Sequence, residues 1–216
     1  MTSSVAVLAS GGLDSAILVA DFLRQDRDVQ PIYVRFGLAW EAVEEAHLRR
    51  FLDTLPAARP LVALEFPIAD VYGSHWSVSG TDVPDERTGD DAVYLPGRNL
   101  LLLAKSSVWC ALHGVPTIAL GTLKGNPFAD SSRDFFHLVE AAVNAALAWP
   151  LEVVTPFAGL TKAEVVARGH GLELQHTFSC IDPQDGRHCG HCNKCEERRR
   201  AFAALQIDDV TQYAAR

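Results

Sequence analysis

The chain has 216 residues, of which 48% are hydrophobic and 21% are charged, a composition typical of a soluble globular protein. This length suffices for one large α/β domain, alone or with a small appendage. No run approaches the roughly 18 apolar residues that span a membrane. The N-terminus lacks the basic region of a signal peptide, so we expect a cytoplasmic protein with no membrane partner. The formal net charge of −8 argues against a protein-wide attraction to nucleic acid.

The first half of the chain alternates apolar β-branched runs with stretches of helical periodicity. The predicted elements are a strand at 5–9, a helix at 15–24, a strand at 29–36, a helix at 41–55 and a strand at 62–66. The first strand ends in SGGLDS, which predicts a glycine turn before the helix. Residues 72–94 are rich in Gly, Ser, Asp and Thr and predict a long loop or lid.

The second half continues the alternation up to the C-terminal region. The predicted elements are a helix at 100–113, a strand at 117–120, a helix at 134–148, a short strand at 153–154 and a helix that begins at Lys162 and is capped by Thr161. This order predicts an α/β, Rossmann-like fold, with a mainly parallel sheet covered by helices on both faces. We expect residues 1–175 to form that domain. Residues 176–216 break the rhythm, and we expect a small cysteine-rich segment and a C-terminal helix packed on the same domain.

The SGGLDS segment has the features of an anion site. It joins a buried strand to a helix N-terminus, where free backbone N–H groups and the positive end of the helix dipole face a ligand. Gly11 and Gly12 let the backbone approach an anion, and Asp14 can bind the magnesium ion that accompanies phosphates. The structural alternative is a strand-to-helix turn with glycine for geometry. The segment resembles the PP-loop of the ATP pyrophosphatases, which cleave ATP between the α and β phosphates.

Four of the five cysteines lie within sixteen residues, at Cys180, Cys189, Cys192 and Cys195. In a reducing compartment such a cluster favours metal ligation over disulfides. Four thiolates satisfy tetrahedral zinc and leave no open position, so the sequence predicts one structural zinc ion per chain. An iron–sulfur cluster is the alternative. A redox CxxC motif would explain two of the four cysteines.

Several motifs occur in one order along the chain: SGGLDS, LPGRN, TPFAGLTKAEV and HTFSC followed by the cysteine tail. This order resembles the 7-cyano-7-deazaguanine (preQ0) synthase family of PP-loop ATP pyrophosphatases over almost the whole chain. The resemblance implies a homodimer of Rossmann-like protomers with zinc beside the active site. It also implies an ATP-dependent ligase of queuosine biosynthesis. ATP would adenylate 7-carboxy-7-deazaguanine, ammonia would give the amide, and a second ATP would lead to the nitrile with release of AMP and pyrophosphate.

Residue roles follow from matching the motifs. The resemblance implies that Asp14, Arg98 and Lys162 are catalytic, with Arg98 and Lys162 neutralising phosphate charge as pyrophosphate departs. It implies that Asn99 lies at the mouth of the nucleotide site. The residues expected to bind ATP and its Mg²⁺ are Ser10, Gly11, Gly12, Leu13, Asp14, Ser15 and Asn99. The structural alternatives are a helix-leading loop for PGRN and a solvated lysine at a helix start.

Two segments depart from the family pattern. Residues 35–41, RFGLAWE, stand where family members usually carry a YGQ-H element. Residues 125–133, GNPFADSSR, stand in place of an SGYPDCR-like element, although Asp130 and Arg133 can match its acid and arginine. We therefore expect the adenylation chemistry to be retained in a divergent branch whose carboxylate or amine substrate can differ.

Three other functions were considered. A related ligase would pass the activated acid to a different amine and stop at the amide. A tRNA-modifying enzyme would need a basic extension and a catalytic cysteine, whereas Cys110 lies inside a predicted buried helix. A nucleotide-binding or zinc-stabilised module without turnover is disfavoured by the intact SGGLDS motif and Lys162.

Overall fold

A computed structural model of the chain has a five-stranded parallel sheet as its centre. The strand order is β3-β2-β1-β4-β5, so the fold class predicted from the sequence is confirmed. The strands are β1 (Ser4–Leu8), β2 (Asp28–Arg35), β3 (Val62–Glu65), β4 (Thr117–Ala119) and β5 (Glu152–Val154). The structure describes residues 4–215; residues 1–3 and Arg216, the outer ends of the two expected segments, lie outside the described residues.

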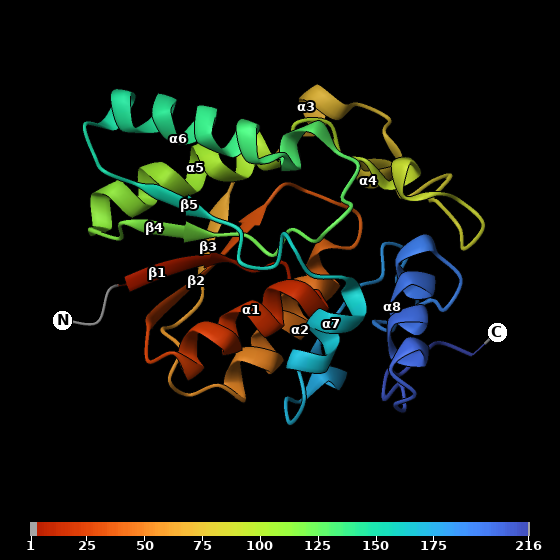
Figure 1. Ribbon diagram of the computed structural model, residues 1–216. Coiled ribbons are helices and arrows are strands. Elements are labelled where there is room, and N and C mark those ends of the chain that lie inside the picture. Colours follow the sequence, from red (N-terminus) through yellow and green to blue (C-terminus); the bar gives the residue numbers. More distant parts are fainter. Residues whose placement is uncertain (1–3, 216) are drawn as a thin grey trace.

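Helices cover both faces of this sheet (Figure 1). One layer contains α5 (Arg98–His113) and α6 (Arg133–Leu147), and the other contains α1 (Leu13–Arg24), α2 (Glu41–Asp53) and α7 (Lys162–Arg168). The C-terminal helix α8 (Asn193–Ala204) packs beside α7. The shorter helices are α3 (Ala69–Tyr72), α4 (Trp76–Ser79) and the 3₁₀ turns η1 (Asp90–Val93), η2 (Ala129–Ser131) and η3 (Leu174–His176).

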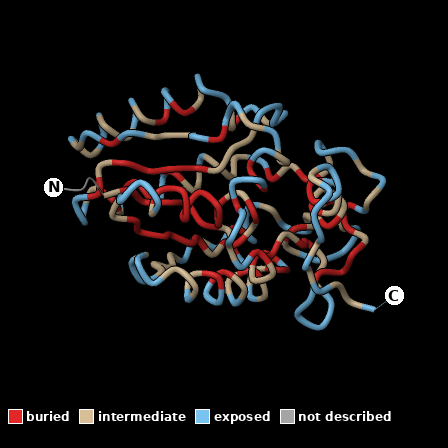
Figure 2. Tube along the Cα trace, turned by 60° about the horizontal axis from the view of Figure 1, so that its bottom comes forward, coloured by how far each residue is buried: buried red, intermediate tan, exposed pale blue. Residues whose placement is uncertain are grey.

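The central strand β1 is buried from Val5 to Leu8, in the buried interior that Figure 2 shows in red. Val5 and Val7 face one apolar cluster with α1, while Ala6 and Leu8 face the other, because successive side chains of a strand alternate between faces. A strand that is buried on both faces has a continuous run of apolar residues, and this run allowed the strand to be predicted from the sequence.

The strand order places a switch point beside β1. The chain runs from β1 to β2 and β3 on one side of the sheet and then returns to β4 and β5 on the other. In open α/β sheets, ligands bind at the carboxyl ends of the strands where the order reverses. The segments that follow β1 and β4 therefore occupy the place where a site is expected.

Most predicted element boundaries agree with the structure within two residues, and two of the differences affect candidate site residues. Helix α1 begins at Leu13 rather than at residue 15, so Asp14 stands in the first turn of a helix and not in a loop. Helix α5 begins at Arg98 rather than at residue 100. Both helices start directly after a glycine, and the N–H groups of their first turns have no acceptor within the helix.

The expected long loop or lid at 72–94 is instead tied to the cysteine segment. It contains α4 and η1, and Asp85 forms an antiparallel bridge with Cys192. The backbone N–H of Glu86 donates to the carbonyl of His191 at 2.9 Å, and that of Asn193 donates to Pro84 at 3.0 Å. These backbone contacts are long-range, so the composition of the segment could not reveal them.

None of the helices in the described part of the chain is both long and apolar enough to cross a membrane.

Candidate functional site

A cleft of about 650 Å³ opens at the carboxyl ends of β1 and β4. Its lining includes the segment after β1 and residues 121–128, which follow β4. It also includes a residue from the first turn of each of three further helices, namely Arg98 of α5, Lys162 of α7 and Lys194 of α8. The positive end of a helix dipole disfavours a cation in its first turn, so three such cations around one cleft indicate an anion-binding site.

The glycine turn after β1 has the geometry that the sequence predicts. Gly11 has a φ of +81°, and a Cβ atom there would lie 3.1 Å from the carbonyl oxygen of Glu44 and 3.2 Å from the Cβ of Leu48. A larger residue would therefore be strained twice, by its backbone and by its neighbours. The backbone N–H of Phe178 donates to the carbonyl of Gly11 at 2.7 Å, which ties the turn to the HTFSC motif.

The two serines of this turn hydrogen-bond to each other. The hydroxyls of Ser10 and Ser15 lie 3.2 Å apart, and the Ser10 N–H donates to the Ser15 hydroxyl at 3.1 Å. The N–H of Gly12 donates to the Ser10 hydroxyl at 3.4 Å. The side chain of Leu13 is fully buried in the core, so its backbone alone remains for a ligand. The turn thus presents hydroxyl and backbone donors at the N-terminus of α1.

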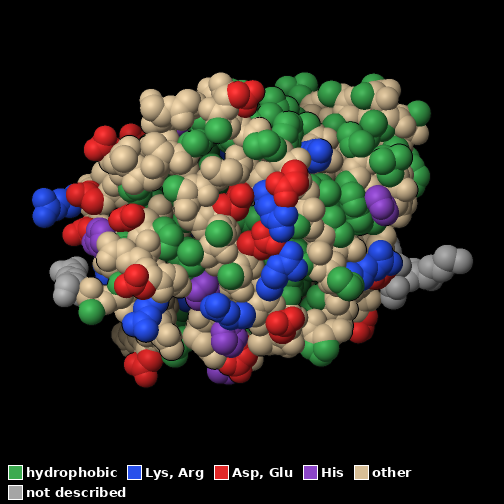
Figure 3. All heavy atoms as spheres, turned by 180° about the vertical axis from the view of Figure 1, so that it is seen from behind, with side chains coloured by type: hydrophobic (Ala, Val, Ile, Leu, Met, Phe, Trp, Pro, Cys, Tyr) green, Lys and Arg blue, Asp and Glu red, His purple; other side chains and the backbone are tan. Residues whose placement is uncertain are grey.

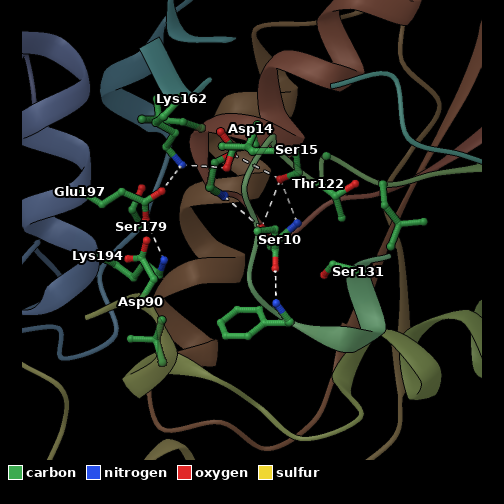
Figure 4. Close-up of a pocket in the computed structure, with 18 of the residues that line it drawn as sticks. Ser10, Asp14, Ser15, Asp90, Thr122, Ser131, Lys162, Ser179, Lys194 and Glu197 are labelled. Carbon is green, nitrogen blue, oxygen red and sulfur yellow. Dashed lines mark hydrogen bonds and ion pairs between the residues drawn. The ribbon is translucent and has the colours of Figure 1, made fainter. Parts of the chain in front are cut away.

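Four charged side chains of the cleft form a continuous series of ion pairs, here named the charged cluster: Asp14, Lys162, Glu197 and Lys194 (Figure 4). Lys162 donates to Asp14 at 2.7 Å and lies 3.2 Å from Glu197. Lys194 donates to the other oxygen of Glu197 at 2.7 Å. The series therefore joins α1, α7 and α8. Asp14 Oδ1 is buried and has no hydrogen-bond partner among residues 4–215, so one carboxylate oxygen is free to bind a cation.

The ionisation of this cluster reflects burial and pairing together. Burial raises the pKa of Asp14 above its usual value, and Lys162 opposes this shift without cancelling it. Burial disfavours the charged form of Lys162, yet Asp14 and Glu197 outweigh it and raise the pKa of that lysine. Burial also opposes the ionised form of Glu197, but Lys162 and Lys194 lower its pKa to about 2. Pairing therefore outweighs burial at Lys162 and Glu197 and favours their charged forms, whereas burial outweighs pairing at Asp14.

Arg98 and Asn99 start α5 but differ in their contacts. Arg98 lines the cleft, and its buried Nε has no hydrogen-bond partner in the part of the chain that the structure describes. The Asn99 side chain donates to the Asp130 carbonyl at 2.9 Å and to the Ser131 hydroxyl at 3.0 Å, and its N–H donates to Asp130 Oδ2. Asn99 therefore holds the η2 segment against α5, while Arg98 keeps donors for a ligand. In residues 125–133, which depart from the family pattern, Arg133 is exposed and donates a hydrogen bond to His137 at 3.2 Å.

Two stacked ring pairs contribute to the same cleft, and we name them the aromatic pairs. Trp40 and Trp76 stack with ring centroids 5.6 Å apart, and Tyr94 and Phe128 stack at 4.9 Å. All four rings line the cleft. Flat aromatic faces of this kind suit a planar heterocycle.

A buried carboxyl supports the first aromatic pair. Tyr33 donates to Glu44 Oε2 at 2.8 Å, and the side chain of Trp40 also hydrogen-bonds to Glu44. Burial raises the pKa of Glu44 to about 7, against the opposing charge of Arg98. Glu44 therefore helps to fix the indole of Trp40, and its own backbone carbonyl and Cγ lie beside Gly11.

The four clustered cysteines come together in a buried site suited to a metal ion. Their sulfur atoms all lie within 4.8 Å of one another, with Cys189 and Cys195 at 3.9 Å and Cys180 and Cys192 at 3.8 Å. A tetrahedral ion with ligand bonds of about 2.3 Å has sulfur–sulfur edges of about 3.8 Å, so the donor set fits. Backbone N–H groups, including that of His191, point at the sulfurs and stabilise thiolates.

Sequence reasoning missed Lys194, Glu197, Glu44 and the aromatic pairs as parts of the cleft. Lys194 lies between two predicted metal ligands, and that position was the one available signal for it. Within the HTFSC motif, Ser179 lines the cleft and Thr177 does not. Both accept hydrogen bonds from the buried guanidinium of Arg198.

Comparison with known proteins agrees with this geometry. The family model "Queuosine biosynthesis protein QueC" matches residues 4–206. The 7-cyano-7-deazaguanine synthase of Methanothermobacter thermautotrophicus is 29% identical over 95% of this chain and 97% of its own, and that of Syntrophobacter fumaroxidans is 32% identical over 96% and 94%. The structure of a 4-thiouridine synthetase–RNA complex with bound ATP has a TM-score of 0.53 at 14% identity, over 95% of this chain and 50% of that one, a likeness of fold alone. The chain belongs to the family of the queuosine biosynthesis protein QueC.

Proposed function

We propose that this enzyme converts 7-carboxy-7-deazaguanine to 7-cyano-7-deazaguanine with ATP and ammonia, releasing AMP and pyrophosphate. The observation that carries the proposal is the cleft itself. A glycine turn of the PP-loop type, a carboxylate oxygen without a partner and three cations at helix N-termini line one space of about 650 Å³. Membership of the QueC family, whose relatives are named 7-cyano-7-deazaguanine synthases, supports the choice of acid.

In the first step the carboxylate of the substrate attacks the α-phosphorus of ATP, and the bond to pyrophosphate breaks. The donors of Ser10, Ser15 and the glycine backbone bind the phosphates, and Asp14 binds the magnesium ion that enters with ATP. Lys162 and Arg98 neutralise the charge that develops on the departing pyrophosphate. All of these residues except Gly11 line the cleft, which supports the assignment.

In the second stage ammonia attacks the acyl adenylate and gives the amide with release of AMP. A second ATP then activates the amide oxygen, and loss of AMP leaves the nitrile. Both activations need the same phosphate-binding groups, so one site serves twice. The aromatic pairs hold the heterocycle in place between the two activations and keep water from the acyl adenylate.

The direct test is incubation of the purified protein with ATP, magnesium, the deazaguanine acid and ammonia, with products read by mass spectrometry. The proposal predicts the nitrile and about two AMP per product. Formation of AMP with an amide as the final product would support the second candidate, a ligase that stops at the amide. The observation that favours this candidate is that Trp40 and Phe128 of the two departing segments line the cleft. Absence of AMP would contradict both.

We propose that the four-cysteine site holds one structural zinc ion per chain. The sulfur–sulfur distances and the lack of an open ligand position support this choice. Zinc there would hold the start of α8, since Cys192 caps the helix and Cys195 lies in its first turn. Metal analysis of the purified protein should give about one zinc per chain; an iron chromophore would contradict the assignment.

We also propose a homodimer formed through α5 and α6. Leu100, Ala104, Val108 and Leu112 recur every fourth residue on α5 and are all exposed, and Leu138 of neighbouring α6 is 71% exposed. Figure 3 shows hydrophobic side chains gathered on this side of the molecule. An exposed apolar stripe of this kind marks an interface. Light scattering should give the mass of a dimer for the wild type and of a monomer for Leu138→Glu; a monomeric wild type would contradict the proposal.

A further inference from the structure

Lys194 occupies an unusual position for a lysine. It is the second residue of α8, where the positive end of the helix dipole disfavours a cation. It lies between Cys192 and Cys195, so a metal ion bound by the cysteines would fix the backbone on both sides of it. Its side chain lines the cleft and does not extend freely into solvent. A cation held at this unfavourable place suggests that it meets an anion there.

The pairing of Lys194 extends beyond its own helix. A lysine and a glutamate three residues apart on a surface helix commonly form a weak local pair. Here the same glutamate, Glu197, also pairs with Lys162 of α7, which in turn pairs with Asp14 of α1. All four side chains line the cleft, and Figure 4 shows them gathered on one side of it. The contact is therefore part of the site and not an isolated surface pair.

The division of partners within the cluster gives Glu197 a defined role. Lys162 has two carboxylate partners, Asp14 at 2.7 Å and Glu197 at 3.2 Å. When Asp14 binds the magnesium of the nucleotide, its negative charge is shared with that ion and its hold on Lys162 weakens. Glu197 then remains as the group that keeps Lys162 in the cleft, while its other oxygen holds Lys194.

We propose that Lys194 is a further pyrophosphate-binding residue and that Glu197 is the positioning residue that directs both lysines at the departing group. This rests on the proposed function only in that the nucleotide is ATP cleaved to AMP and pyrophosphate. The bond between the α-phosphorus and the bridging oxygen breaks, and the pyrophosphate that leaves with the electron pair receives hydrogen bonds from Lys162 and Lys194 together.

Binding of magnesium pyrophosphate, measured by titration calorimetry on the full-length protein with its zinc content verified, tests Lys194. Lys194→Met should weaken binding roughly tenfold, because a hydrogen bond to a charged group is lost. Lys194→Arg keeps the charge and should recover most of the affinity. Lys105→Met makes the same chemical change at an exposed position of α5, outside the cleft, and should leave binding unchanged. Equal affinity in Lys194→Met and the wild type, with zinc retained, would overturn the proposal.

A double-mutant cycle tests Glu197. If Glu197 acts through the lysines, the loss caused by Lys194→Met should be at least threefold smaller in a Glu197→Gln background. Glu196→Gln alters the neighbouring residue, which pairs with Arg199 and Arg200 instead of the two lysines, and should leave the loss caused by Lys194→Met unchanged. Additive effects of Lys194 and Glu197 would overturn the positioning role. Tight pyrophosphate binding without turnover of the deazaguanine acid would refute the proposed substrate and leave this inference standing, whereas a wild type that binds no pyrophosphate would refute this inference.

Discussion

In the lining of the cleft, the charged cluster stands on helices and the aromatic pairs stand mostly on connecting segments. Asp14, Lys162 and Lys194 lie in the first turns of α1, α7 and α8. Trp40 precedes α2, and Phe128 precedes η2 in a segment with no regular structure. Helix starts are fixed by packing against the sheet, whereas connecting segments can change without cost to the core. The difference suggests that the part of the cleft on helix starts tolerates change less than the part on connecting segments.

The largest expected effect comes from removing a ligand of the proposed zinc ion, because that site would hold the start of α8, the helix that carries Lys194 and Glu197. Structural zinc contributes about 10–16 kcal/mol in small zinc-binding peptides, so Cys192→Ser should unfold the protein or lower its melting temperature severely. Cys110→Ala alters a buried cysteine outside the cluster and should cost only about 1 kcal/mol. Thermal unfolding with zinc analysis checks both variants. A stable, active Cys192→Ser protein would mean that α8 does not depend on the metal site.

The next effect isolates the activation chemistry itself. Asp14→Asn removes the charge that we expect to bind magnesium and should lower AMP formation about 10²–10³-fold. The fold should survive, because the side chain is partly exposed in the first turn of α1. Asp21→Asn changes an aspartate on the same helix that pairs with Arg24 and Arg168, and AMP release should stay close to the wild-type rate. Undiminished AMP release by Asp14→Asn would refute the placement of the magnesium.

The third effect concerns Glu44, the buried carboxyl that hydrogen-bonds to Trp40 of the aromatic pairs, and it is a change in stability with pH. Burial raises the pKa of Glu44 from 4.5 to about 7, so the folded state binds its proton more tightly than the unfolded state. Its contribution to stability is complete below pH 4.5 and is lost as the pH rises through about 7. The difference, 7 minus 4.5, corresponds to about 3–4 kcal/mol at roughly 1.4 kcal/mol per pKa unit.

Denaturant titrations of wild type and Glu44→Gln between pH 5 and pH 8 measure this contribution. The wild type should lose more stability than Glu44→Gln over that range, because the amide carries no ionisation. Parallel pH profiles for the two proteins would contradict a buried, titrating Glu44.

The smallest effect tests the aromatic pairs directly. Trp76→Leu should raise the KM for the deazaguanine acid roughly tenfold, since stacking of a base on an aromatic ring contributes about 1–3 kcal/mol. The KM for ATP should stay unchanged, and Trp109→Leu, on α5 outside the cleft, should alter neither value. A rise confined to the KM for ATP would instead assign Trp76 to the adenine of ATP. It would contradict the role of the aromatic pairs in binding the acid.

The sequence predicted the parts of the site that are local in the chain. SGGLDS follows an apolar run, and the capping box of Thr161 and Glu164 sets Lys162 at the start of α7, so both features could be read from neighbouring residues. The cysteine spacing likewise predicted a cluster that the structure brings together.

The remaining parts depend on long-range packing and could not be predicted in this way. Glu197 reaches the cleft because α8 lies beside α7, and nothing in its own neighbourhood indicates this. Trp76 lies in a segment whose composition predicts a loop, and backbone contacts to the cysteine segment hold that loop in place. The positions of Glu197 and Trp76 in the cleft are therefore set by tertiary contacts, which the local sequence pattern does not show.

The most direct test of the central claim is exchange of labelled pyrophosphate into ATP. If the charged cluster activates an acid held at the aromatic pairs, exchange should require 7-carboxy-7-deazaguanine and should proceed without ammonia. Asp14→Asn should lower the rate of this exchange about 10²–10³-fold. Absence of exchange with the acid, or the same exchange without it, would contradict the account.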